Sequence, residues 1–487
     1  MKMKKMMMMA LGFLFTVTII TPLFGETKNN AQGKIAATSE DSLLVSLNDC
    51  IDMALKNNHF RPASQFAIKI AEAQRKQALS AYWPQLKANS VYTVMDQAPN
   101  FLFPASQMAV PPMKILNFDL ELPPVDVPEQ DVKLMDRKNW LSTLNLTYPL
   151  FTGGLIRSYN RQAKSAVEIA KQEARRTDLK IIYDVKRFYY AALLARNVRQ
   201  ITEEALARLQ ATLDLTENLY KKGSGKVKKT DYLKNKVVVD NVRALVAKMR
   251  NSEKIAKAAL VNTMGLDWKT CIKIKAQEIP FDPYPTDVNK FISGAYQFNP
   301  DWARLKEALK IFDAKIGEAR SGYFPKVALM GTLGHIENAY DKGMVTPRNK
   351  DLWTVGIGIQ LPLFSGFRTR NQVKEARARL DKLSEQKILL REGLALQVQY
   401  VFLQMASAQE QQQALKDALT AAEENRSLTE RAYQFELVEE KDLIESQIIE
   451  SFMKAQYQKI LYDHIETQAH LDFIVGEKVV EKLLRSE

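Results

Sequence analysis

The sequence predicts a mixed α and β fold made of two structural repeats, each with two transmembrane β-strands and long coiled-coil α-helices. Two sets of observations support this fold class. The phrase LTYPLFTGGLIR at residues 146–157 returns as IQLPLFSGFRTR at residues 359–370, and residues 50–86 align without gaps on residues 291–327. Apolar residues alternate with polar ones before each copy of the phrase and recur at every third or fourth position after it, which are the periods of a strand and of a helix.

The first 25 residues are predicted to be a secretory signal peptide and not part of the fold. Lys2, Lys4 and Lys5 form a basic start, residues 6–20 are apolar, and cleavage is expected near Gly25. No cysteine lies near this position, so acylation as a lipoprotein is not expected. Beyond it, no apolar stretch approaches the ~20 residues of a membrane-spanning helix. The remaining chain is therefore expected to be soluble, peripheral or a β-barrel.

The composition is that of an ordinary folded protein. The 487 residues are 46% hydrophobic and 26% charged, with a formal net charge of +13. Because the basic residues are scattered among acidic ones, a solvated surface explains this charge better than a nucleic-acid partner does. The two cysteines allow at most one disulfide, and Cys50 occupies an apolar helical position that predicts a buried thiol, while Cys271 lies between the repeats.

The two repeats are expected over residues 41–265 and 286–478, with a linker over 266–285 and a tail over 479–487. The repeats are offset by 241 residues in one block and by 213 in the other, so the first repeat holds 28 more residues between its blocks. The excess lies in the Pro-rich stretch 97–138. An insertion confined to one place is typical of a surface loop.

Each repeat contains two strands in which apolar and polar residues alternate, less cleanly in residues 327–335, where Met330 and His335 break the pattern. Aromatic residues such as Trp140, Trp353, Tyr82 and Phe364 stand near both ends of the strands. Strands of about 10 residues with aromatic residues at both ends are typical of a transmembrane barrel. A soluble sandwich with one wet face would show the same alternation. The strands are expected over about residues 85–96, 139–150, 326–337 and 352–363.

The helices that follow are too long for a compact domain. Apolar residues recur with a helical period over about residues 154–220 and 368–433, and neither stretch contains a proline. Each such rod would be about 100 Å long. Rods of this length pack side by side as coiled coils. Four strands cannot close a barrel, since about eight are needed, and open edges are not tolerated in lipid. Several chains must therefore pool their strands with cyclic symmetry, two giving eight and three giving twelve.

Proline marks each of the four passages between strand and helix. Because proline continues neither a helix nor a central strand, Pro149 and Pro362 are expected to end the second strand of each repeat. Glycine follows, and it supplies the backbone freedom for the turn into the long helix. The junction residues are Pro84, Pro149, Gly153, Pro325, Pro362 and Gly366.

The duplicated PLF(T/S)G phrase before a long helix, the YWP and YFP junctions, and helix-turn-helix signatures at residues 220–236 and 433–447 resemble the TolC-type outer-membrane efflux family, over residues of about 44–476. The resemblance implies a homotrimer, with a twelve-stranded barrel in the outer-membrane lipid and an α-helical tunnel through the periplasm. It further implies the exit duct of a multi-component efflux or type I secretion system. A periplasmic adaptor protein and an inner-membrane pump would dock on the helix tips.

The resemblance also assigns a constriction, or gate, to the periplasmic tips. Tyr433, Asp442 and Glu445 match the family pattern of the second tip, and Asp231 matches the equivalent acid of the first. In a trimer, Asp442 and Glu445 would converge as stacked acidic rings that attract cations. The other interpretation is a solvated helix start, where acids are favoured by the helix dipole.

The tips also depart from the family pattern. Glu436 stands where the pattern has glycine, two extra residues precede Gly225, and Val438 replaces a basic residue that is sometimes present. Lys441, or lysines of the first tip, would have to supply any gating salt bridge. The lysines of the first tip either contact an acidic adaptor surface or keep an exposed turn soluble; they include Lys222, Lys226, Lys228 and Lys229.

No motif in the chain predicts an enzyme, a cofactor or a metal site. KKGSGK lacks the earlier glycine and the following Ser or Thr of a phosphate-binding loop. His59, His335, His464 and His470 form no helical ligand pair. Two alternatives to an export duct are a non-conducting, envelope-spanning coiled-coil scaffold and a soluble coiled-coil adaptor. Conductance separates the duct from the scaffold, and the duplicated amphipathic strands speak against the soluble adaptor.

Overall fold

The computed structural model describes residues 42–111, 113–115, 118–120, 123–222, 228–282 and 287–476. The predicted signal peptide, Gly225, Lys226 and the predicted tail lie outside the described residues. All elements discussed below belong to one compact unit, Leu43–Glu487.

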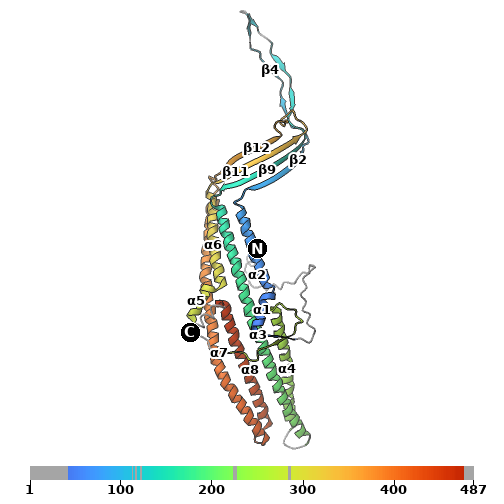
Figure 1. The fold of residues 1–487 in the computed structure, drawn as a ribbon, viewed down its shortest axis with the longest axis vertical. Coiled ribbons are helices and arrows are strands. Elements are labelled where there is room, and N and C mark those ends of the chain that lie inside the picture. Colours follow the sequence, from blue (N-terminus) through green and yellow to red (C-terminus); the bar gives the residue numbers. More distant parts are fainter. Residues whose placement is uncertain are drawn as a thin grey trace, which may run out of the picture. The chain divides into compact units, whose positions relative to one another are not determined.

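Both repeats have the same order of elements, with two helices, a strand, a second strand, a 67-residue helix and a shorter helix (Figure 1). The sequence predicts one helix before each first strand, whereas the structure has two. In the first repeat the elements are α1 (Leu47–Asn57), α2 (Phe60–Ser80), β2 (Gln85–Val94), β9 (Lys138–Phe151), α3 (Leu155–Lys221) and α4 (Lys229–Thr263). In the second they are α5 (Val288–Phe298), α6 (Pro300–Arg320), β11 (Lys326–Asn338), β12 (Asp351–Gln360), α7 (Arg368–Gln434) and α8 (Glu440–Val475).

An equivalent asparagine joins the start and the end of each repeat. Asn58 lies between α1 and α2, and its amide nitrogen donates to the Thr263 carbonyl at the end of α4, at 2.8 Å. Asn299 lies between α5 and α6 and donates to the Ile474 carbonyl near the end of α8, at 2.9 Å. Both are buried, so each satisfies a helix-terminal carbonyl that would otherwise lack a partner.

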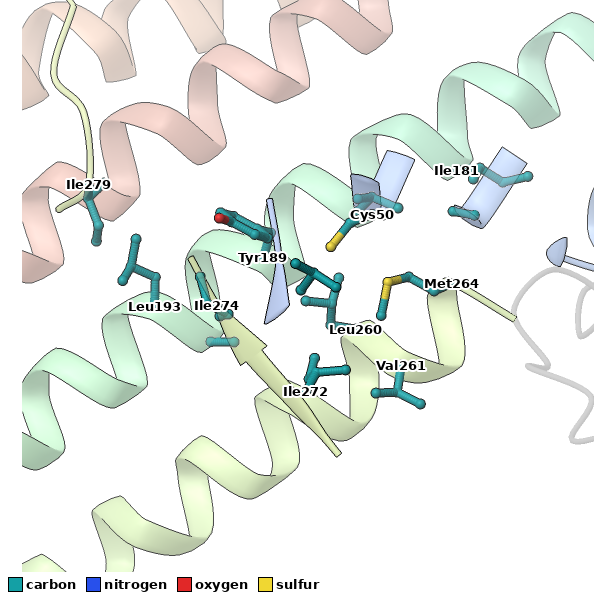
Figure 2. Packing of buried hydrophobic residues seen from close by; sticks show 14 of the residues in the cluster. Cys50, Ile181, Tyr189, Leu193, Leu260, Val261, Met264, Ile272, Ile274 and Ile279 are labelled. Carbon is teal, nitrogen blue, oxygen red and sulfur yellow. The ribbon is translucent and has the colours of Figure 1, made fainter. Parts of the chain in front are cut away.

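The core of the first repeat gathers residues from α1, α3, α4 and the short parallel strands β1 (Leu43–Val45) and β10 (Ile272–Ile274). Figure 2 shows the Cys50 thiol among Tyr189, Leu260 and Met264. Cys50 is fully buried, as its position predicts, and burial raises the pKa of its thiol to about 12. Cys271 is exposed, and the two cysteines are not bonded to each other.

The long helices pack along one another. α3 contacts α2, α4, α6 and α8, while α7 contacts α5, α6 and α8. Alanine lines much of this packing, and Ala174, Ala192, Ala205, Ala314 and Ala408 are all buried. Within the described residues, no helix combines the length and the hydropathy needed to cross a membrane.

The four long strands form one antiparallel sheet in the order β12-β11-β9-β2. Among the described residues, the outer edges of β2 and β12 have no partner strand. The register places the alternating side chains of all four strands on common faces, because opposite residues in neighbouring strands share a face. One face is apolar and includes Leu86, Leu144, Leu146, Leu329, Leu333, Trp353, Val355 and Ile357.

Pro149 does not end its strand, which corrects the sequence prediction. β9 continues to Phe151, and Ala328 and Val327 of β11 lie opposite Pro149 and Phe151, so the ladder shifts register there. Leu150 has no opposite residue at this irregularity. A proline lacks the N–H needed by a regular ladder and is tolerated at such an irregularity.

The other three junction prolines lie outside their strands. Pro84 and Pro325 directly precede β2 and β11, and Pro362 follows β12, which ends at Gln360.

The Pro-rich stretch forms a ribbon and not a loop. Three short antiparallel ladders follow one another: β3 (Asn100–Phe103) with β8 (Gln130–Lys133), β4 (Ser106–Met108) with β7 (Val125–Val127), and β5 (Met113–Ile115) with β6 (Phe118–Leu120). All three share one register, so the ribbon prolongs the β2–β9 hairpin. Prolines interrupt both strands at matched levels, which limits each ladder to three or four residues. Such short segments show no alternation that a sequence pattern can detect.

Each long helix begins after two residues in the left-handed region. Gly153 and Gly154 have φ values of +63° and +86°, and Gly366 and Phe367 have 58° and 61°. Glycine adopts this conformation without a steric penalty. Phe367 takes the place of Gly154 in the second repeat and carries that penalty.

The two glycines before α3 give a matched test of this junction. A Cβ at Gly153 would lie 2.6 Å from the Phe324 Cβ and 2.9 Å from the Ser321 carbonyl oxygen, whereas at Gly154 it would meet no heavy atom within 4 Å. We expect Gly154→Ala to cost about 1 kcal/mol from the left-handed backbone alone, and Gly153→Ala to cost clearly more. Thermal unfolding of the detergent-purified protein measures both, and equal losses would contradict the packing at this junction.

Candidate functional site

The candidate site comprises the tips of the hairpins α3/α4 and α7/α8, where α3 and α7 end and α4 and α8 begin. These helix ends lie opposite the sheet (Figure 1). α3 starts four residues after β9 and has 67 residues, so its far end is about 100 Å from the sheet. The tips are therefore separated from the strands by the full length of the rods.

Asp231 and Asp442 have the same local role. Each is the third residue of its helix, and a carboxylate oxygen accepts the backbone N–H of the residue before the helix, Lys228 or Glu439, at 3.2 Å in both cases. This arrangement satisfies an N–H at the helix start. The geometry supports the helix-start interpretation for both acids. Glu445 lies one turn beyond Asp442 and is exposed.

Glu436 explains why the family pattern has glycine at this position. Its φ is 60°, and its N–H donates to the Tyr433 carbonyl while the Leu437 N–H donates to the Ala432 carbonyl, at 3.0 and 2.9 Å. This is the left-handed end of a helix that glycine adopts most readily. Glu436 keeps the conformation at a cost of about 1 kcal/mol.

Glu440, which the sequence did not single out, joins the two hairpins. The Asn235 amide nitrogen of α4 donates to the Glu440 carboxylate and to the Thr216 hydroxyl of α3. Asn235 and Thr216 are buried. Burial, and then the negative charge of Asp231, raise the pKa of Glu440 to about 7. Burial and Glu440 in turn raise the pKa of Tyr433.

A comparison of the two tip sequences could have singled out Glu440. Aligning Asp442 with Asp231 places Glu439 and Glu440 at the positions of Lys228 and Lys229. The first tip is thus basic where the second is acidic.

A buried carboxylate fastens the hairpins further from the tips. Glu450 of α8 is 1% exposed and pairs with Arg426 of α7 and Lys454 of α8, each at 2.9 Å. Arg208 of α3 lies 3.5 Å away. Removing one member of such a buried group leaves an uncompensated charge and costs several kcal/mol, so this cluster holds α3, α7 and α8 together.

The lysines of the tips are exposed where they are described. Lys222 directly follows α3, Lys228 precedes α4 and Lys229 begins it, while Lys226 lies outside the described residues. Lys441 pairs with Glu439 at 3.0 Å and not with Asp442. A gating salt bridge from Lys441 stays a prediction.

Among the described residues, no three His, Cys, Asp or Glu side chains come together in a way that could hold a metal ion.

We expect the burial of Glu440 beside Asp231 to make hairpin docking dependent on pH. Because the folded state raises the pKa of Glu440 from 4.5 to about 7, it binds the proton more tightly than the unfolded chain does. The contribution of Glu440 to the free energy of unfolding is therefore fully present below pH 4.5, and it is lost as the pH rises through 7. We expect the unfolding temperature to fall over this range in the wild type and to fall less in Glu440→Gln. Glu424→Gln, an exposed position on α7, is the control; an unchanged pH slope in Glu440→Gln would contradict the assignment.

Comparison with known proteins gives two kinds of match. The family model described as outer membrane efflux protein matches residues 50–266 and 291–476. The alkaline protease secretion protein AprF of Pseudomonas aeruginosa is 23% identical over 353 residues, which cover 70% of each chain. The probable efflux pump outer membrane protein TtgC of Pseudomonas putida is 24% identical over 302 residues, which cover 59% of this chain and 58% of that protein. The latter match spans less than two thirds of the relative.

Among solved structures, the Campylobacter jejuni CmeC outer membrane channel is similar with a TM-score of 0.71 at 15% identity, over 93% of this chain and 94% of that chain. At this identity the likeness supports the fold alone. The family model, by contrast, covers both repeats and leaves out only the linker region between them and the two ends. The chain therefore belongs to the outer membrane efflux protein family.

Proposed function

We propose that three copies of this chain form an outer-membrane barrel and a periplasmic tunnel, which together act as the exit duct of an efflux or type I secretion system. The observation that carries this proposal is the four-stranded sheet, whose two edges lack a partner strand in the described chain and whose one face is apolar. An apolar face with open edges is stable in lipid only if other copies complete the ladder.

The length of the helices supports the tunnel. α3 and α7 each have 67 residues and continue from strands of the same sheet. A cyclic arrangement that closes the strands into a barrel would therefore bring the rods into a ring beneath it. Three copies would supply twelve strands, which exceeds the about eight that the smallest barrels need.

The tips would form the gate of this tunnel. In a ring, Asp442 and Glu445 of three copies would converge and attract cations. The basic first tip and the acidic second tip would alternate around the ring and attract each other. Opening would separate the hairpins at the Asn235–Glu440 contact, while the Glu450 cluster would keep their upper parts together.

The partners would be a periplasmic adaptor and an inner-membrane pump. The names of AprF and TtgC refer to secretion of a protease and to an efflux pump, and these correspond to the two kinds of system that such a duct would serve. The exposed lysines of the first tip, Lys222, Lys228 and Lys229, together with Lys226, would contact an acidic surface of the adaptor. Charge on such a rim mainly sets the rate and specificity of association.

Conductance in planar bilayers tests the proposal. We expect a small, cation-preferring conductance from the wild type, because the acidic rings narrow the entrance and attract cations. Asp442→Ala/Glu445→Ala should raise the conductance or weaken the preference. The control is Asp267→Ala/Glu278→Ala, which removes two exposed acids from the linker. If the tip variant has the conductance and cation preference of the wild type, Asp442 and Glu445 do not form the constriction, although the chain still forms a duct. A stable oligomer with no conductance would favour the non-conducting scaffold.

A further inference from the structure

The face of the sheet opposite the apolar band is mainly polar in the half nearest the helices, whereas Val91, Leu141, Ile336 and Leu352 lie on it further out; the whole face carries charge of one sign. It includes Gln85 and Asn89 of β2, Thr143 and Asn145 of β9, and Thr354 of β12, as the register requires. Among the residues of the four long strands, the charged members of this face are Lys87 and Lys326.

The acids of these strands lie on the other face. Glu337 and Asp351 share the parity of Leu333 and Trp353, and therefore the apolar face, near the ends of the strands that lie away from the helices. The His335 ring pairs with Asp351 at 2.7 Å on that same face. The polar face therefore has lysines with no acid of these strands beside them.

Lys87 lies in a row of hydrogen-bonding side chains that crosses the sheet. It is opposite Asn145, which is opposite Thr332, which is opposite Thr354. The Thr332 hydroxyl donates to the Asn145 side-chain oxygen at 2.9 Å, and the Asn145 amide nitrogen donates to the Thr143 hydroxyl at 3.1 Å. These contacts hold the neutral side chains of the row, while the Lys87 side chain is exposed.

Lys326 adds a second positive charge to this face, nearer the helices than Lys87. It lies opposite Gln360 at the first residue of β11 and is also exposed. Lys87 and Lys326 therefore extend one sign of charge along the half of the sheet closest to the rods.

We infer that Lys87 and Lys326 form a basic collar inside the barrel, which makes this segment of the duct favour anionic solutes and acidic cargo. The inference rests on the proposed function, because it requires the polar face to line the lumen. Three copies would place six ammonium groups around one aqueous path. A narrow lumen between low-dielectric walls strengthens the field of such a ring.

The collar would act independently of the acidic tips. The two are separated by helices of 67 residues, or about 100 Å, while the screening length at physiological ionic strength is about 8 Å. The duct would thus carry two filters of opposite sign in series.

Ion selectivity in a background that lacks the two acidic rings tests the collar. The background is Asp442→Asn/Glu445→Gln, and the comparison adds Lys87→Gln/Lys326→Gln. The control adds Lys138→Gln, which removes a lysine of β9 from the face that carries Trp140 and Leu144. Reversal potentials in a KCl gradient report the ratio of chloride to potassium permeability.

We expect the background protein without the acidic rings to prefer chloride, the added collar substitutions to lower its ratio of chloride to potassium permeability, and the Lys138→Gln control to leave that ratio unchanged. The shift should shrink at high salt, because salt screens the ring. The collar would be contradicted if its substitutions left the permeability ratio unchanged, or if Lys138→Gln changed the ratio equally. Either result would leave the proposed duct in place. An absence of conductance in every variant would instead remove the proposed function on which the collar rests.

Discussion

Unpaired backbone groups at the two edges of the sheet are the constraint on which the rest of the structure depends. β2 and β12 each have ten residues, and each edge presents a row of N–H and C=O groups with no partner in the described chain. In hydrocarbon every such group costs several kcal/mol. Water could satisfy these groups, but it could not satisfy the apolar face of the same strands. Only another copy of the sheet meets both requirements, and this leads to the proposed barrel.

The helices follow from the same constraint. Strands β9 and β12 are followed directly by α3 and α7, so any ring of strands imposes a ring of rods. Small buried residues such as Ala192 and Ala408 let the rods approach one another closely. The hairpin ends are positioned by the Asn235–Glu440 contact, by the cluster around Glu450, and by a hydrophobic cluster of Leu209, Leu213, Val239 and Ile444 that joins α3, α4 and α8.

Patterns of local origin could be predicted from the sequence. The alternation in residues 352–363 and the unbroken helical period of residues 368–433 gave elements close to β12 and α7, because each depends on the chain's own neighbours. Long-range contacts could not be predicted in this way. Glu440 becomes important only because Asn235, more than 200 residues earlier, lies against it. The ribbon at residues 97–138 was missed because its prolines suggested a loop, and Pro149 was misjudged because a register shift in a neighbouring strand accommodates it.

The mass of the native particle tests the central claim most directly. The full chain has a mass of 55.4 kDa, and native mass spectrometry of the detergent-released protein counts the copies that complete the sheet. We expect a particle of three chains that dissociates only when the β-structure unfolds. A stable, folded monomer that retains its strands in detergent would contradict it, because the edges of β2 and β12 would then be tolerated without a partner.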